Sequence, residues 1–165
     1  MHPDLPLSVT HEVRDRCLCL HLQRAARAVA RRFDTALRPL GLTNTQYSLL
    51  VSLNRPVPPR MGDVARLLAM DRTTLTAALK PLERRGLLKG ITDPKDRRGR
   101  LLALTRDGQN LLRQAVPLWR AIQGEIDREL SRQGTNDPRP ALLTLAFSGP
   151  GSGEKTGAAE KPLET

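Results

Sequence analysis

The sequence predicts a mainly α-helical fold that carries one small β-hairpin. Aliphatic residues recur at helical spacing in two long stretches, residues 13–40 and 105–130, and in shorter stretches elsewhere. Two short aliphatic runs flank a turn-rich basic segment, residues 93–100, which is typical of a hairpin. With two Phe, one Tyr and one Trp among 165 residues, the core must be mostly aliphatic, which favours packed helices over a sandwich or barrel.

The N-terminal part predicts an arm followed by one long helix. Residues 1–12 contain several helix breakers and are expected to form a flexible arm. Helical periodicity runs from Val13 to Leu40, where Pro39 and Gly41 end it. Cys17 and Cys19 stand two apart on this helix, so they are expected to point apart and to stay unpaired. The sequence shows neither a signal peptide nor a membrane span, and we therefore expect a cytoplasmic protein with reduced thiols.

The central part predicts a helix-turn-helix. Thr43 begins a helix through Leu53, with Gln46 completing a capping box. A short helix is expected over residues 61–68. Asp71 then caps a helix over residues 72–85, which Pro81 should kink. Two short helices joined by a tight turn make up this motif.

The remaining chain predicts a hairpin, a long helix and a tail. Residues 87–92 and 101–104 are the expected strands. Thr105 caps a long helix that Pro117 should bend, residues 134–140 interrupt it, and residues 141–147 form one more short helix. Residues 148–165 are rich in Gly, Ser, Pro and Glu and are expected to be a disordered tail. A helix-turn-helix followed by a basic hairpin is a winged helix-turn-helix, here over residues 41–104.

The charge distribution points to a polyanionic partner, which we expect to be double-stranded DNA. The formal net charge is +10, and most of the 27 basic residues are arginines, which bind phosphate in a bidentate manner. The second helix of the motif would enter the major groove, and the hairpin would contact the minor groove or the backbone. The expected DNA contacts are Arg72, Thr73, Thr74, Thr76, Lys80 and Arg84 on the helix and Lys95, Arg97, Arg98 and Arg100 on the hairpin.

Within the hairpin, Arg98 is the first candidate for insertion into the minor groove. Asp96 is expected to hold an arginine of the loop, because a carboxylate facing phosphate would be repelled. Taken singly, a basic hairpin is often a solvated turn, and threonines that begin a helix often only cap it. A winged fold used for protein contacts is the alternative without DNA.

Several motifs resemble the MarR family of bacterial transcriptional regulators. The resemblance covers about residues 13–130 and rests on Asp71-Arg-Thr-Thr-Leu-Thr76, on Leu82-Glu-Arg-Arg-Gly-Leu87 and on a wing pattern formed by Asp96, Arg98, Leu102, Leu104 and Thr105. It implies a homodimer held together by the helices of residues 13–40 and 105–147. It further implies binding to a pseudo-palindromic operator, usually as a repressor that an effector releases.

Two sensing mechanisms remain open. Cys17-Leu-Cys-Leu20 resembles the organic-hydroperoxide-sensing branch of the family, which would make Cys19 the reactive thiol of a redox sensor. Two tyrosines that contact the sulfur in that branch fall on Phe33 and Asn44, however. The favoured alternative is a small aromatic or amphipathic acid in a pocket, for which the candidates are Cys19, His21, Arg24, Tyr47 and Trp119.

Enzymatic and metal chemistry are not expected. The sequence offers no glycine-rich phosphate loop and no set of nucleophile, base and orienting residue. Cys17 and His21 would share a helical face, but a zinc site needs three or four ligands. We therefore expect no catalytic residues, no metal and no cofactor.

Overall fold

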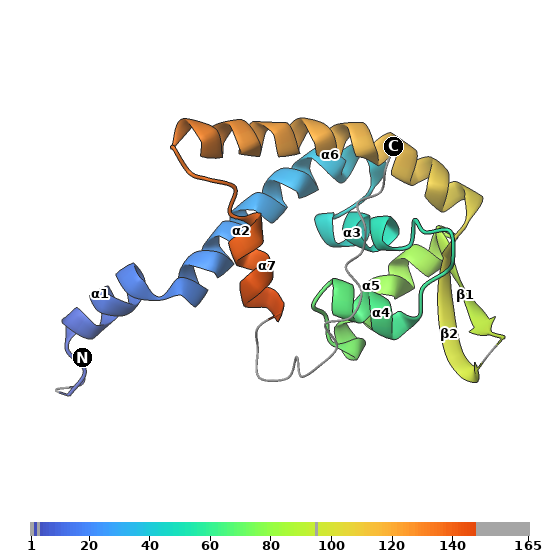
Figure 1. Ribbon diagram of the computed structural model, residues 1–165, viewed down its shortest axis with the longest axis horizontal. Helices are drawn as coiled ribbons and strands as arrows, with labels where there is room; N and C mark the ends of the chain where they lie inside the picture. Colours follow the sequence, from blue (N-terminus) through green and yellow to red (C-terminus); the bar gives the residue numbers. More distant parts are fainter. Residues whose placement is uncertain (1, 3, 95, 148–165) are drawn as a thin grey trace. The chain divides into compact units, whose positions relative to one another are not determined.

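The computed structural model describes residue 2, residues 4–94 and residues 96–147, without the side chains of Arg97 and Arg98 (Figure 1). The expected tail, residues 148–165, lies outside the described residues. The elements in chain order are α1 (Leu7–Arg16), α2 (Leu18–Leu37), the 3-10 turn η1 (Arg38–Leu40), α3 (Asn44–Ser52), α4 (Met61–Leu67), α5 (Arg72–Arg84), β1 (Leu88–Asp93), β2 (Asp96–Leu104), α6 (Arg106–Arg132) and α7 (Arg139–Phe147). The predicted class, mainly α with one hairpin, is confirmed. The chain divides into two compact units, Met1–Ile126 and Asp127–Thr165.

The N-terminal helices correct two predictions. Helix α1 already begins at Leu7, so the expected arm over residues 1–12 extends too far. The single helix expected from residue 13 is also wrong, because the chain is extended at Cys17 (φ −73°, ψ 102°) and a new helix begins at Leu18. The apolar pattern could not reveal this break, since Cys17 fits the helical period. We expected Cys17 and Cys19 to point apart because both would lie on one helix. Cys17 lies between two helices, so this argument does not apply.

The transition from α2 to α3 follows the local signals in the sequence. Gly41 adopts a left-handed conformation (φ 62°) and its N–H donates to the carbonyl of Arg38, which closes the turn. The predicted capping box at Thr43 is confirmed. The backbone N–H of Gln46 donates to Thr43 Oγ1 over 3.2 Å, and the N–H of Thr43 donates to Gln46 Oε1 over 3.0 Å.

Helices α4 and α5 form the predicted helix-turn-helix. Asp71 caps α5 as expected, because its Oδ1 accepts the backbone N–H of Thr74 over 2.8 Å and its Oδ2 accepts the hydroxyl over 2.5 Å. These bonds from Thr74 stabilise the carboxylate and hold the pKa of Asp71 below its ordinary value. Pro81 lies inside α5, as the sequence predicted.

The hairpin is paired farther toward its tip than expected. Strands β1 and β2 are antiparallel, and Leu88 faces Leu104 at the base. We expected a loop over residues 93–100, but β2 begins at Asp96, which is in register with Asp93 after an irregularity next to Thr92. The segment before α4 pairs with the free edge of β2, because the N–H of Leu102 donates to the carbonyl of Pro59 over 3.0 Å.

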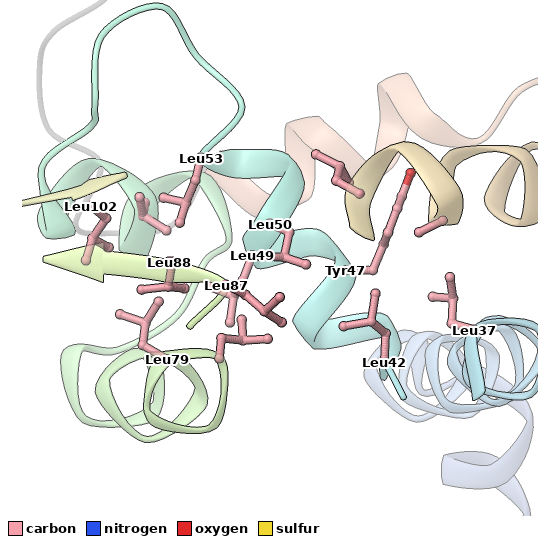
Figure 2. Packing of buried hydrophobic residues seen from close by; sticks show 14 of the residues in the cluster. Leu37, Leu42, Tyr47, Leu49, Leu50, Leu53, Leu79, Leu87, Leu88 and Leu102 are labelled. Carbon is pink, nitrogen blue, oxygen red and sulfur yellow. The ribbon is translucent and has the colours of Figure 1, made fainter. Parts of the chain in front are cut away.

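Leucines from α3, α5 and the hairpin form the centre of the buried core. Figure 2 shows Leu49 and Leu50 of α3 near Leu79 of α5 and Leu88 of β1. The largest fully buried side chains are Leu37, Leu49, Leu50, Leu75, Leu79, Leu82, Leu102 and Val64. The core therefore fixes the position of α5 and of the wing, the hairpin of β1 and β2, on one support.

The start of α6 packs tightly against the base of the wing. Thr105 is its predicted cap: its Oγ1 accepts the N–H of Gly108 over 3.1 Å and donates to the carbonyl of Gly86 over 2.6 Å. A Cβ added to Gly108 would lie 1.9 Å from the carbonyl oxygen of Leu87, so only glycine fits there. Pro117 lies inside the helix. Among the helices that the structure describes, none combines the length and the apolar character needed to cross a bilayer.

Candidate DNA interface

One exposed face of α5 carries a row of basic and hydroxyl side chains. Arg72, Thr76, Lys80 and Arg84 follow one another at intervals of four, which places them along one side of the helix. Arg72, Thr73, Thr76 and Lys80 line a surface hollow of about 380 Å³ together with Ala77. The opposite side of the helix is anchored, since Leu75, Leu79 and Leu82 are buried in the core. The helix is thus held by its apolar face and presents its cationic face outward.

The threonines of α5 have different roles. Thr73 is exposed in the first turn and lines the hollow. Thr74 points its hydroxyl to the Asp71 carboxylate, so it completes the cap, a role that the sequence analysis did not assign to it. The half-buried Thr76 donates its hydroxyl to the carbonyl of Arg72 over 2.7 Å, which leaves its methyl group and oxygen lone pairs for a ligand.

The wing places Arg100 differently from the expectation. Its guanidinium Nη2 lies 2.6 Å from Oε1 of Glu83 on α5, in an ion pair that joins the wing to the helix. We expected a DNA contact, but the structure engages this side chain within the chain itself. Lys95 and the side chains of Arg97 and Arg98 lie outside the described part of the structure. Their role as DNA contacts, and that of Asp96 as a partner for an arginine, stays a prediction.

A second ion pair on the wing was missed by the sequence analysis. Arg60 precedes α4, and its Nη2 lies 2.6 Å from Oδ2 of Asp93, whose side chain is only 5% exposed. The pair crosses from the helix-turn-helix to the wing, and no signal in the sequence links two residues so far apart. A hollow of about 260 Å³ lies beside it, lined among others by Arg60, Arg72 and Arg100. Three arginines thus surround the junction of α4, α5 and the wing.

A separate apolar pocket lies between α3, α4 and α6. It measures about 450 Å³, and Tyr47 and Trp119 stack in its wall with ring centroids 6.4 Å apart. Arg120 and Ser48 add polar groups to a lining that includes Val51 and Leu112 among its other residues. Burial raises the pKa of Tyr47, and the nearby charge of Arg120 partly opposes this shift. Aromatic walls with one cation would suit a small amphipathic anion.

The five candidate pocket residues do not come together in this chain. Only Tyr47 and Trp119 line the apolar pocket. Cys19, His21 and Arg24 are exposed in the first turns of α2 and are not among the residues that line it. Gln23 Nε2 donates to Cys19 Sγ over 3.4 Å, and His21 Nδ1 lies 2.9 Å from the carbonyl oxygen of Cys17. The sequence analysis missed Arg120, because the helical pattern does not tell which other element this face of α6 lies against.

Among the described residues, no three His, Cys, Asp or Glu side chains are grouped so as to hold a metal ion.

The fold and this surface define a winged helix-turn-helix DNA-binding protein. The MarR family matches residues 42–99. The chain is 33% identical over 113 residues to the transcriptional activatory protein BadR of Rhodopseudomonas palustris, which covers 66% of this chain and 65% of that protein, just under two thirds. It is 30% identical over 138 residues to the organic hydroperoxide resistance transcriptional regulator of Bacillus subtilis, covering 82% and 90%.

Solved structures agree with these relatives. The M. tuberculosis transcriptional regulator MosR in complex with DNA shares 35% identity and a TM-score of 0.71, over 81% of this chain and 96% of that one. CouR of Rhodococcus jostii RHA1 bound to p-coumaroyl-CoA shares 27% identity and a TM-score of 0.67, over 82% and 95%. The chain belongs to the MarR family. It is a DNA-binding transcriptional regulator, in a family of regulators and not of enzymes.

Proposed function

We propose that the chain is a homodimeric, sequence-specific repressor that acts in the cytoplasm and releases its operator when a small molecule binds. The observation that carries the DNA-binding part is the row of Arg72, Thr76, Lys80 and Arg84 on the outward face of α5, whose leucines are buried in the core. Guanidinium and hydroxyl groups at the start of the helix suit base edges, and cations farther along suit phosphate. The net charge of +10 supports the same partner.

Fluorescence anisotropy tests this proposal with labelled duplexes from the protein's own promoter region and with scrambled duplexes of equal length. Specific binding to a short inverted repeat is expected, with half-sites about 34 Å apart on one face of the DNA. Arg72→Ala should lower the preference for particular bases, by about 1 to 3 kcal/mol per site. Equal affinity for scrambled DNA would favour a winged module for protein contacts. Transcription in vitro would separate repression from activation, the role named for BadR.

Apolar side chains at both ends of the described chain support the dimer. Leu7, Val13 and Leu18 are at least half exposed on α1 and α2. Within the unit that begins at Asp127, Leu143 and Phe147 of α7 are also at least half exposed. Surfaces of this kind are covered by partners in stable proteins, and we assign them to a second copy of the chain. Sedimentation of Leu18→Glu should show dissociation, whereas Val57→Glu, in an exposed loop, should leave the dimer intact.

The apolar pocket at Tyr47 and Trp119 is the proposed effector site. Because Trp119 is the single tryptophan of the chain and lies in the pocket wall, its fluorescence reports occupancy directly. Titration with benzoate and with the neutral benzamide is the first screen for an aromatic acid. Tighter binding of benzoate, lost in Arg120→Gln, would support the pocket, and release of DNA by the same compound would support the regulatory role. Equal binding of both compounds would remove Arg120 from the site.

A thiol sensor at Cys19 is the second candidate. The similarity to the Bacillus regulator favours it, and Cys19 is exposed in the first turn of α2. Oxidation of the sulfur would add a polar group where helices α1 and α2 meet. Cumene hydroperoxide should then abolish DNA binding by the natural chain and leave Cys19→Ser bound. Loss of binding in both proteins, or in neither, would reject this candidate.

A further inference from the structure

The proposed function gives no role to the ion pair between Arg100 of the wing and Glu83 of α5. Arg100 lies on β2 opposite Thr92, and its guanidinium passes over Gly90, two residues before Thr92 on β1, to reach the helix. A Cβ added to Gly90 would lie 2.0 Å from Arg100 Nε. Glycine therefore leaves the space through which this arginine passes, and the contact depends on three residues of three different elements.

Glu83 stands at a sensitive place for a carboxylate. It lies three residues after Lys80 and beside Arg84 in sequence, close to the face of α5 that carries the proposed DNA contacts. Its side chain is 27% exposed, so it keeps some access to solvent. A carboxylate next to DNA phosphate is unfavourable, and the paired guanidinium compensates its charge.

A second ion pair holds the wing toward the start of α4. Arg60 pairs with Asp93, and the N–H of Leu102 bonds to the carbonyl of Pro59, so the segment before α4 anchors β1 and β2. The contact with Glu83 is the matching anchor toward α5. Exposed ion pairs contribute little to global stability, and the effect of this one is expected in the spacing of the two elements that it joins.

We propose that Arg100 is a positioning residue which fixes the wing against α5, and that it does not contact phosphate. The proposal rests on the proposed function, in which α5 and the wing bind one duplex together. Two elements that bind the same DNA bind it best when their spacing is already fixed. Any conformational freedom between them is lost on binding, and this loss of entropy lowers the affinity. Glu83 and Gly90 share this role. Glu83 accepts the hydrogen bond from the guanidinium, and Gly90 leaves the space that the guanidinium occupies.

The test compares variants by the slope of log affinity against log salt. A phosphate contact contributes about one unit to this slope. Arg100→Ala is expected to lower affinity about five- to tenfold with an unchanged slope. Lys80→Ala, the control on the exposed face of α5, is expected to reduce the slope by about one unit.

Glu83→Ala gives an opposite sign under the two explanations. If Arg100 positions the wing, removing Glu83 weakens DNA binding several-fold although the protein becomes more positive. If Arg100 contacts phosphate, the same change strengthens binding, because a negative charge near DNA is lost and the arginine is freed. Tighter binding by Glu83→Ala, or a slope reduced by one unit in Arg100→Ala, would overturn the proposal.

Gly90→Ala is the second variant, since it keeps both charges and blocks the passage of Arg100. It is expected to reproduce the loss of affinity expected for Arg100→Ala, and unaltered affinity would contradict the proposed positioning role of Arg100. Circular dichroism melts of every variant verify that the folded state is retained at the binding temperature. Absence of specific binding by the unaltered protein would instead reject the proposed function, so the two failures are distinguishable.

Discussion

The N-terminal helices and the central part of the first unit use the same residue types in opposite ways. From Leu7 to Arg32 no residue is buried, although leucines and valines recur along both helices. Between Leu42 and Leu102 most leucines are buried, and Leu49 and Leu50 have no exposed surface at all. Leu18, by contrast, is 56% exposed. The difference shows that helical periodicity identifies an apolar face but does not tell whether the same chain covers it.

This contrast separates two sources of stability. The winged helix-turn-helix buries its own core and can position α5 and the wing within one copy of the chain. Helix α1 and the first half of α2 gain little from their own fold, since only Phe33 and Leu37 of α2 are buried. Their apolar surface becomes useful only when a second copy covers it, as we propose.

Leu49→Ala should have the largest effect on the core. Removing a fully buried leucine leaves a cavity and is expected to cost about 2 to 5 kcal/mol of unfolding free energy, measured by urea denaturation. Leu18→Ala at low protein concentration is the matched change in the other region. Similar losses of unfolding free energy in both variants would contradict the difference between the two regions.

Gly108→Ala should be the next largest. The added Cβ meets the backbone carbonyl of Leu87, which cannot move without disturbing the base of the wing, and a loss of about 1 to 3 kcal/mol is expected. Gly62→Ala is the control, because nothing lies within 4 Å of its added Cβ inside α4. That variant should be neutral or slightly more stable, so thermal melts of the pair give shifts of different sign or size.

Thr43→Ala probes the capping box at the start of α3. The substitution removes Oγ1, which accepts the N–H of Gln46, and leaves the backbone N–H that donates to Gln46 Oε1 in place. Loss of the side-chain acceptor is expected to cost about 1 kcal/mol in urea denaturation. Thr45→Ala, at an exposed site in the same helix, is the control. Equal effects of the two substitutions would mean that the box does not stabilise the folded chain.

Asp71→Asn probes the cap of α5 through pH. Asparagine also caps helices, so the variant removes chiefly the charge and its effect should be smaller than that of Thr43→Ala. Because the pKa of Asp71 is lowered in the folded state by its bonds from Thr74, the charged form stabilises the fold above the ordinary pKa of 3.8. This advantage disappears as the pH falls through the lowered pKa. Melting temperatures of both proteins should therefore differ at pH 6 and converge as the pH falls through the lowered pKa of Asp71, and a constant difference would contradict this assignment.

Leu18→Ala should have the smallest effect on unfolding of the single chain. Its side chain is already largely in solvent, so a change within about 0.5 kcal/mol is expected at low concentration. The dimer dissociation constant, followed by sedimentation, should rise instead. An unchanged dissociation constant would remove this side chain from the proposed interface.

Much of the fold follows from local signals in the sequence. Thr43 with Gln46, Asp71 and Thr105 are caps whose side chains bond the nearest backbone N–H groups, so their meaning is contained in a few neighbouring residues. The basic row on α5 follows from helical spacing alone. The break at Cys17 did not follow, because nothing in its neighbourhood departs from the apolar period.

The sequence by itself determined the order of the elements, their caps, the aliphatic core and the cationic face of α5. The tertiary structure decided that Arg60 and Arg100 form ion pairs with residues that are distant in sequence. It also decided that Tyr47 and Trp119 share a pocket with Arg120 and that Cys19, His21 and Arg24 lie elsewhere. The physical reason is range: caps and periodicity act within a turn or two, whereas ion pairs and pockets depend on how separate elements pack together.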